Sequence, residues 1–311
     1  MSSPSNNRQL FRKDYQNRDI YKKLLRNLLE RKIIGLTRTH ACAHRQLAVF
    51  AFDYISTQIV LDGLYELDEL ELFTKWLGSL ADTNVFNGLA VDVGANIGNH
   101  SLYFSDFYTE VLALEPHPLT FKLLSVNSEL ASNVSCVNYG LSSEERSATL
   151  VVDTRNLSGA RVEHRGNGSS TSIKLRTLDS VLKEASDKPV RLIKIDVEGH
   201  ETEVLVGAES TIRNHQPFIL FEQHASDFSG GSTCAIELLR NYGYENFACV
   251  EKFPRPPDWL PHGMQPIYSL ATRLLVGGSI RIVSARVFKP KFHPFIIAIP
   301  PRLALDALKD A

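Results

Sequence analysis

Residues 91–100 read Val-Asp-Val-Gly-Ala-Asn-Ile-Gly-Asn-His, and this stretch decides the fold. The apolar run at residues 89–93 predicts a short buried strand. Gly94 allows a tight turn directly after the strand, and Gly98 allows close approach of the helix that follows. A strand, a glycine turn and a helix in this order indicate a βα unit whose helix N-terminus faces a ligand.

An acid on the next strand suggests which ligand this turn binds. The glycines are spaced G-x-x-x-G, whereas dinucleotide-binding turns are spaced G-x-G-x-x-G. Glu115 ends the next predicted strand, residues 110–115, and lies 21 residues after Gly94. At that distance it can accept hydrogen bonds from two hydroxyls of a ribose. A plain βα corner is the structural alternative, but Asp92 and Glu115 on either side of the turn favour a cationic, adenosine-containing cofactor.

The alternation of strands and helices continues along the chain. Further strands are predicted at residues 134–139, 148–153, 172–176, 191–196, 218–222 and 295–299. Helices are predicted at residues 67–80, 119–130, 178–185, 204–213 and 234–241. A loop rich in Gly and Ser is expected at residues 158–172. The pattern predicts an α/β fold with a doubly wound, Rossmann-like sheet covered by helices on both faces.

Charge and proline content divide the chain into three predicted parts. Residues 1–60 form a basic helical N-terminal arm, residues 61–253 form the cofactor-binding core, and residues 254–311 hold a proline-rich insert and the last strand of the core sheet. Residues 1–45 carry 11 Lys and Arg against three acids, a net charge of +8, while the remainder carries −9.

The arm contains an amphipathic helical pattern. Ile20, Leu24 and Leu28 repeat every four residues, with Tyr21, Leu25 and Leu29 beside them. We expect this helix to pack on the body through its apolar stripe or to mediate a homodimer. The alternative is a surface for an anionic membrane or an anionic substrate.

The composition excludes several classes of protein. The net charge of −1 gives no overall bias toward nucleic acid or membrane. The four cysteines form no C-x-x-C pair, which argues against a zinc knuckle or a dithiol redox site. Residues 1–19 lack the apolar core of a secretory signal, and no uncharged apolar run reaches the ~20 residues of a membrane span. We therefore expect a cytoplasmic protein without a transmembrane segment.

Several segments between residues 60 and 225 carry a family resemblance. They are residues 63–66, 92–102, 115–118, 177–179, 193–201, 207–208 and 221–222. In this order they resemble the FkbM family of class I methyltransferases, and the run Lys-Ile-Asp-Val-Glu-Gly at residues 194–199 is the most specific match. The resemblance implies S-adenosylmethionine as cofactor, held by Asp92, Gly94, Asn96, Gly98, Glu115 and Asp196. The arm and residues 251–294 lie outside it, so it does not imply the acceptor.

Two predicted strand tips carry the candidate catalytic residues. Asp196 and His200 follow one strand, and Glu222 and His224 follow the next. Methyl transfer to a hydroxyl needs a group that takes up the hydroxyl proton, and a carboxylate or imidazole near the oxygen can do so. His200 and Asp196 are the leading candidates for this role. The structural alternative is that acids in this stretch cap the following helix.

A divalent metal held by Asp196, Glu222 and His224 is a less favoured alternative, so we do not assign these residues as metal ligands. We expect an S-adenosylmethionine-dependent O-methyltransferase that acts on a hydroxyl of a small molecule, such as a sugar or natural product. The rival functions are a nucleic-acid methyltransferase and a non-catalytic, cofactor-binding partner subunit. Nucleic acid is not expected as a partner, because residues 196–199 replace the Asn/Asp-Pro-Pro-aromatic motif of base methyltransferases.

Overall fold

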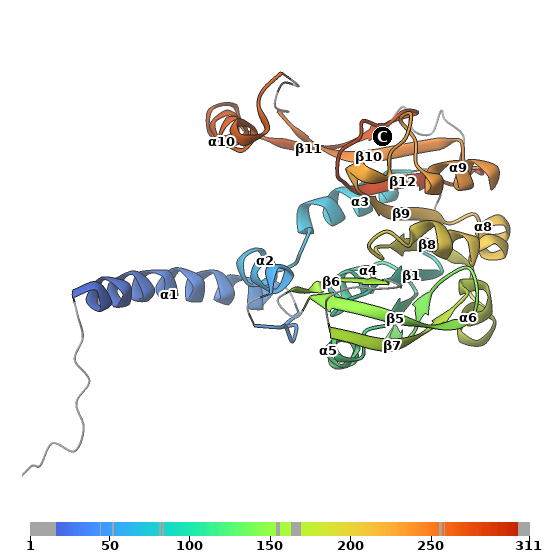
Figure 1. Ribbon diagram of the computed structural model, residues 1–311, viewed down its shortest axis with the longest axis horizontal. Coiled ribbons are helices and arrows are strands. Elements are labelled where there is room, and N and C mark those ends of the chain that lie inside the picture. Colours follow the sequence, from blue (N-terminus) through green and yellow to red (C-terminus); the bar gives the residue numbers. More distant parts are fainter. Residues whose placement is uncertain are drawn as a thin grey trace, which may run out of the picture.

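A computed structural model describes residues 17–43, 45–51, 53–80, 82, 84–153, 156–162, 169–254, 257 and 259–303. Its centre is an eight-stranded sheet with the strand order β11-β10-β12-β9-β8-β1-β2-β3 (Figure 1). The strands are β1 (Leu89–Val93), β2 (Glu110–Leu114), β3 (Val134–Val137), β8 (Val190–Ile195), β9 (Phe218–Gln223), β10 (Asn246–Phe253), β11 (Ser279–Ser284) and β12 (His293–Ile299).

Five neighbouring strands of this sheet, β9, β8, β1, β2 and β3, are parallel, as the alternation of strands and helices predicts. β12 runs antiparallel between β9 and β10, and β11 pairs antiparallel with β10 at the edge. The sequence analysis predicts β12 but neither β10 nor β11. β11 lies within the segment that the prolines marked as an insert, so part of that segment extends the core sheet.

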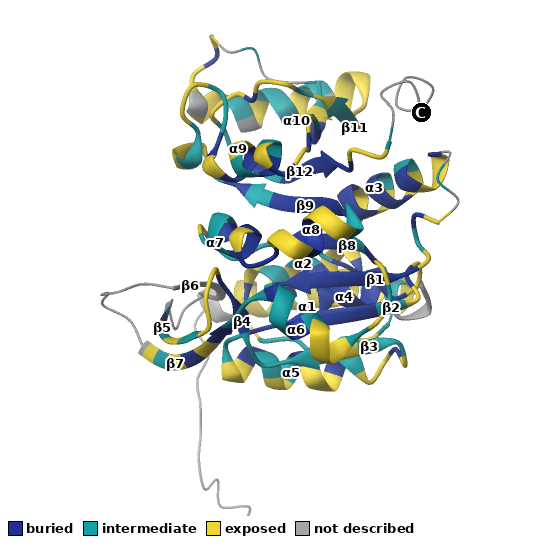
Figure 2. Cartoon of the chain, turned by 90° about the vertical axis from the view of Figure 1, so that its right-hand side faces the viewer, coloured by how far each residue is buried: buried dark blue, intermediate teal, exposed yellow. Residues whose placement is uncertain are grey.

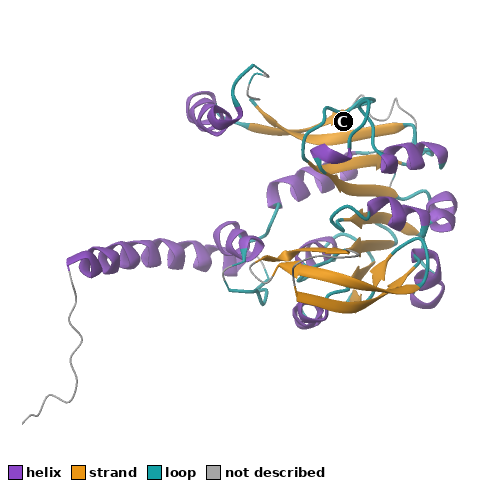
Figure 3. Ribbon diagram, viewed as in Figure 1, coloured by secondary structure: helices purple, strands orange, loops and turns teal. Residues whose placement is uncertain are grey.

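Ten helices are described (Figure 3). They are α1 (Asn17–Ala43), α2 (Tyr54–Asp62), α3 (Leu67–Ser79), α4 (Asn99–Phe104), α5 (Pro118–Ser128), α6 (Leu178–Ala185), α7 (Glu201–Val206), α8 (Glu209–His215), α9 (Cys234–Asn241) and α10 (Gln265–Val276). The single helix predicted at residues 204–213 is wrong, because the chain breaks at Gly207 into α7 and α8. A side chain at 207 would lie 2.0 Å from the carbonyl oxygen of Ser142, so only glycine fits this close approach.

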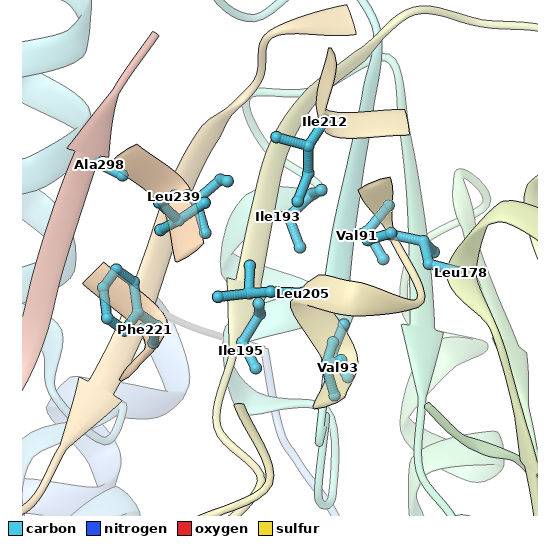
Figure 4. Packing of buried hydrophobic residues seen from close by; sticks show 14 of the residues in the cluster. Val91, Val93, Leu178, Ile193, Ile195, Leu205, Ile212, Phe221, Leu239 and Ala298 are labelled. Carbon is cyan, nitrogen blue, oxygen red and sulfur yellow. The ribbon is translucent and has the colours of Figure 1, made fainter. Parts of the chain in front are cut away.

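The two faces of the sheet bury separate apolar cores. Side chains alternate along a strand, so Val91, Ile193 and Phe221 face one side with α6 to α9. Leu192 and Leu220 face the other side with α3 and α4. Figure 4 shows the first of these cores, and Figure 2 shows β1 buried along its length. Burial on both faces explains why the strands are continuous apolar runs.

A second, four-stranded sheet has the order β4-β7-β5-β6. Its strands are β4 (Gly140–Leu141), β5 (Arg146–Asp153), β6 (Asn156–Val162) and β7 (Ser169–Arg176). The expected Gly- and Ser-rich loop at residues 158–172 is therefore wrong for its two ends, which belong to β6 and β7. Residues 163–168 lie outside the described residues. Small hydroxyl residues pair here as strands because their neighbours complete the ladder.

The basic arm forms the expected helix, but its apolar side chains do not pack on the body. Figure 1 shows α1 projecting away from the sheets. Leu24 is 61% exposed and Leu28 is 62% exposed. Residues 20–29 are exposed at every position, so this part of the helix does not pack on the body, and the alternative of a homodimer stays a prediction. Residues 1–16 of the arm and the final residues 304–311 lie outside the described residues, and the three-part division of the chain stays a prediction.

Candidate active site

A cavity of about 320 Å³ opens at the carboxyl ends of β1, β2, β8 and β9. Open α/β sheets bind their ligands at this edge. Seven of the predicted site residues line it, namely Gly94, Asn96, Glu115, Asp196, His200, Glu222 and His224. Its size is at the lower end of the roughly 300–1,000 Å³ of small-molecule pockets.

The glycine turn forms one wall through close backbone packing. Gly94 has a φ of +74°, and a side chain there would lie 1.9 Å from the carbonyl oxygen of Asp196. Asn96 also has a left-handed backbone, with φ of +50°. Gly98 has a φ of +93° and packs against Leu124 of α5, but it does not line the cavity. The turn therefore brings two strands and two helices together beside the ligand space.

Glu115 is fixed at the rim by backbone amides. Its two carboxylate oxygens accept hydrogen bonds from the amides of Asn96 at 3.0 Å and His117 at 2.8 Å. Burial raises the pKa of Glu115 to about 7, although these amides and Lys194 lower it. A carboxylate has about four acceptor positions, so two are left for hydroxyls of a ligand.

Lys194 is a site residue to which the sequence assigned no role, although it begins the matching run at residues 194–199. Its side chain is 4% exposed, and its Nζ lies 3.2 Å from Oδ1 of Asp92 and 3.4 Å from Oδ2 of Asp196. It also donates to the carbonyl oxygen of Gly94 at 3.3 Å. Burial alone would lower the pKa of Lys194, but the two aspartates hold it above its ordinary value. The signal was a charged residue between Ile193 and Ile195 in a buried strand.

Asp92 and Asp196 therefore have different positions. Asp92 is fully buried, accepts a hydrogen bond from Ser101 Oγ at 2.6 Å and does not line the cavity. Any effect of Asp92 on a bound cofactor would pass through Lys194 and the glycine turn. Asp196 lines the cavity and is 35% exposed. One lysine thus ties the acid before the turn to the acid at the cavity.

Glu222 and His224 form a close pair at the end of β9. His224 Nε2 lies 3.1 Å from Glu222 Oε1 and 3.6 Å from Glu198 Oε2. Burial, together with the carboxylates of Asp196 and Glu198, raises the pKa of Glu222 above its usual range. The ring of His224 therefore lies between two carboxylates at the cavity wall.

His200 lies on the same cavity but has other partners. Its Nε2 is 3.0 Å from the Ser142 hydroxyl oxygen, and its Nδ1 is 3.7 Å from Glu203 Oε2. Burial lowers the pKa of His200, which keeps the imidazole neutral near pH 7. His200 and Asp196, the two leading candidates for the proton acceptor, both line the cavity but have separate partners. Asp196 pairs with Lys194, and His200 contacts Ser142 in the loop after β4.

Tyr54 and Tyr65 also line the cavity, and neither was predicted as a site residue. The backbone of Tyr65 is fixed by two 3.0 Å hydrogen bonds with the side chain of Asn99 in α4. Burial raises the pKa of the Tyr65 hydroxyl, and the nearby carboxylates of Glu66, Asp196 and Glu222 raise it further. Tyr65 therefore offers a neutral hydroxyl among acids. The resemblance contained a hint of this site, because residues 63–66 are one of the matching segments.

Within the described part of the chain, no group of three or more His, Cys, Asp or Glu side chains is arranged to hold a metal ion. In the same part of the chain, no helix is both long and apolar enough to cross a membrane.

The parallel sheet, the glycine turn and the acid at the end of β2 define a Rossmann-like class I methyltransferase domain. Residues 92–245 match the model of the methyltransferase FkbM domain. The chain is 30% identical over 199 residues to methyltransferase sdnD of Sordaria araneosa, covering 53% of this chain and 73% of that protein. The chain belongs to the FkbM methyltransferase family.

Two further proteins are similar over shorter shares of their length. The hexuronic acid methyltransferase AglP of Haloferax volcanii is 33% identical over 135 residues, which are 43% of this chain and 55% of AglP. The crystal structure of an FkbM methyltransferase from Methylobacillus flagellatus has 21% identity and a TM-score of 0.34, over 68% of this chain and 52% of that one. This chain therefore spans about half the length of both.

Proposed function

We propose that this chain is an S-adenosylmethionine-dependent O-methyltransferase that acts on a hydroxyl of a small molecule, such as a sugar or natural product. The main support is the Glu222–His224 pair, 3.1 Å apart on the wall of the cavity that Glu115 also lines. The similarity to a relative named as a hexuronic acid methyltransferase supports a sugar as acceptor.

The residues around the cavity fit this cofactor. Glu115 has acceptor positions left for ribose hydroxyls, and the amides of the turn at Gly94 and Asn96 border the same space. Asp196 offers a carboxylate to an ammonium group, while Lys194 holds it in place. When bound, S-adenosylmethionine supplies an electrophilic methyl group. The acids that surround the cavity favour such a cation over an anionic ligand.

The protein's own part in the chemistry is to orient the acceptor hydroxyl and take its proton. We assign the proton to His224 Nε2, because the carboxylate of Glu198 lies 3.6 Å away to stabilise the imidazolium and Glu222 lies 3.1 Å away to orient the ring. His200 is the other imidazole on the cavity, but Ser142 already contacts its Nε2. Tyr65 can donate a hydrogen bond to the acceptor, since its hydroxyl stays protonated at neutral pH.

The test begins with a mass-spectrometry screen of hydroxylated small molecules and a methyl-labelled cofactor. We then compare His224→Gln with His200→Gln on the acceptor found. Loss of the base lowers kcat by about 10²–10⁴ and leaves cofactor affinity unchanged. A larger loss in His200→Gln would move the base to His200. Binding of NAD without S-adenosylmethionine, or transfer to oligonucleotides alone, would contradict the proposed function.

A further inference from the structure

Helix α1 presents apolar side chains that the rest of the described chain leaves uncovered. Residues 20–29 are exposed at every position, including Ile20 at 48%, Tyr21 at 75% and Leu25 at 58%. Figure 1 shows that the helix runs outward from α2 and away from both sheets. A group of exposed large apolar side chains of this kind marks an interaction surface.

Within residues 20–29 the apolar side chains gather on one half of the helix. At 100° per residue, six of them fall on one half-circle between residues 20 and 29. They are Ile20, Tyr21, Leu24, Leu25, Leu28 and Leu29. Lys22, Lys23, Arg26 and Asn27 fall on the opposite half. Arg31 and Lys32 lie on the apolar half, where they end the apolar stripe. Helix α1 as a whole carries seven Lys and Arg against two acids.

From this arrangement we infer that residues 20–29 of α1 dock in the plane of an anionic lipid bilayer. The apolar half-circle enters the boundary between headgroups and acyl chains, and the basic side chains contact anionic headgroups. The charge of the helix is complementary to such a surface, where each Lys or Arg adds to the attraction. The long basic side chains that flank the apolar face can extend to the headgroups while their stems stay among apolar atoms.

Other partners account for only part of this surface. A second copy of α1 would bring two strongly basic helices together, with only Asp19 and Glu30 to offset them. A coiled-coil seam continued from Leu24 and Leu28 would also reach Arg31 and Gly35. A nucleic acid would use the basic side chains but would leave the leucines in water. A bilayer uses both halves of the helix.

Docking of α1 would also hold the candidate active site near the lipid surface. The Nε2 atom of His40, near the end of α1, lies 2.7 Å from the carbonyl oxygen of Leu61 in α2. The first turn of α2 carries Tyr54 and Ile55, which line the cavity, and Tyr54 is 64% exposed. The helix that contacts the bilayer is thus tied to the helix that borders the cavity.

The test uses full-length protein and vesicle flotation. Vesicles of phosphatidylcholine with about one third phosphatidylserine are compared with phosphatidylcholine alone. Leu24→Glu and Asn27→Glu form a matched pair, because each adds one negative charge to an exposed position on opposite halves of one helix. We expect binding to anionic vesicles only, weakened by salt. Leu24→Glu should lower the partition coefficient by more than about tenfold, and Asn27→Glu by no more than about fivefold.

Four results would overturn the inference. They are no binding to anionic vesicles at low salt, equal binding to both vesicle types, equal losses in the two variants, and a dimer by light scattering that Leu24→Glu converts to a monomer. Retention on a duplex oligonucleotide that Leu24→Glu leaves unchanged, without vesicle binding, would assign the basic residues to nucleic acid instead. Far-ultraviolet circular dichroism of both variants checks that α1 still forms. None of these readouts depends on methyl transfer.

Discussion

Lys194 connects the parts of the site that are far apart in the sequence. It joins Asp92 on β1 to Asp196 after β8 and donates to the carbonyl of Gly94. We expect Lys194→Met to lower the free energy of unfolding by about 3–5 kcal/mol, because the fully buried carboxylate of Asp92 and the partly exposed one of Asp196 lose their cation. Urea denaturation measures this loss.

The control for Lys194→Met is the double variant with Asp92→Asn. It removes one of the two carboxylates that the lysine neutralises, so the double variant should be more stable than the sum of the single losses predicts. Strict additivity would contradict the coupling between the two residues.

At Glu115 the expected effect is on binding. Glu115→Ala removes charge-assisted hydrogen bonds to the ribose and should weaken S-adenosylmethionine binding by about 1.5–3 kcal/mol, roughly ten- to hundredfold. Isothermal calorimetry measures it. Glu110→Ala is the matched control, since Glu110 starts the same strand β2 at the opposite end and is 41% exposed. Equal losses in the two variants would show that β2, not the carboxylate, is responsible.

The raised pKa of Glu222 predicts that the free energy of unfolding depends on pH. Its pKa in the folded protein lies above its unfolded value, so its contribution to stability is full at low pH and is lost as pH rises past about 4.3. Relative to Glu222→Gln, the wild type should therefore lose about 1–2 kcal/mol in its free energy of unfolding between pH 5 and pH 8. Urea denaturation at each pH measures it, with the exposed Glu71→Gln as control. A wild-type stability that stays constant or rises relative to Glu222→Gln between pH 5 and pH 8 would contradict the assignment.

At the residue scale, the sequence predicts a site residue where that residue lies at a regular separation in sequence from the glycine turn. Glu115 could be predicted because a strand and helix separate it from Gly94 in the usual way. Lys194 could not, since its partners come from two strands whose order in the sheet the sequence does not state. The same holds for His200, whose contact with Ser142 depends on the loop after β4.

At the scale of elements, the close packing of β1 and β8 sets the shape of the turn. Gly94→Ala places a methyl group 1.9 Å from the carbonyl oxygen of Asp196, so the strands must separate. Gly199 also has a positive φ, of +94°, but no atom lies within 4 Å of a side chain there. We expect Gly199→Ala to cost only about 1–2 kcal/mol of backbone strain. Gly94→Ala should cost clearly more and weaken cofactor binding, as thermal unfolding and calorimetry would measure. Equal costs would contradict the steric argument.

Three of the strands that the sequence did not predict share one cause. β6, β10 and β11 lie at or near sheet edges, where polar and small residues are tolerated because neighbours supply the hydrogen bonds. The parallel strands were predictable, since burial on both faces demands apolar runs. Gly207 shows the reverse error, because periodicity alone continues a helix through a position where the close approach of Ser142 requires glycine and where α7 ends.

At the scale of the molecule, α1 and the body meet at a narrow junction. Arg45 donates to both carboxylate oxygens of Asp106, at 3.0 and 2.6 Å, and to the carbonyl of Leu102 at 2.9 Å. Two residues on, Leu47 packs against the core. The body therefore begins at about Arg45.

This junction leads to a prediction about truncation. Deleting residues 1–39 removes most of the projecting helix and should leave the midpoint of thermal unfolding and the affinity for S-adenosylmethionine close to those of the full chain. Deleting residues 1–45 also removes Arg45 and should lower the midpoint by about 4 °C or less, because a partly exposed, bidentate pair with one backbone contact contributes about 1 kcal/mol. Arg45→Ala in the full chain is the control and should reproduce that shift. If the shorter deletion already lowers the midpoint, α1 contributes to the stability of the body. Its leucines would then pack on the body, which would contradict their role in binding a bilayer.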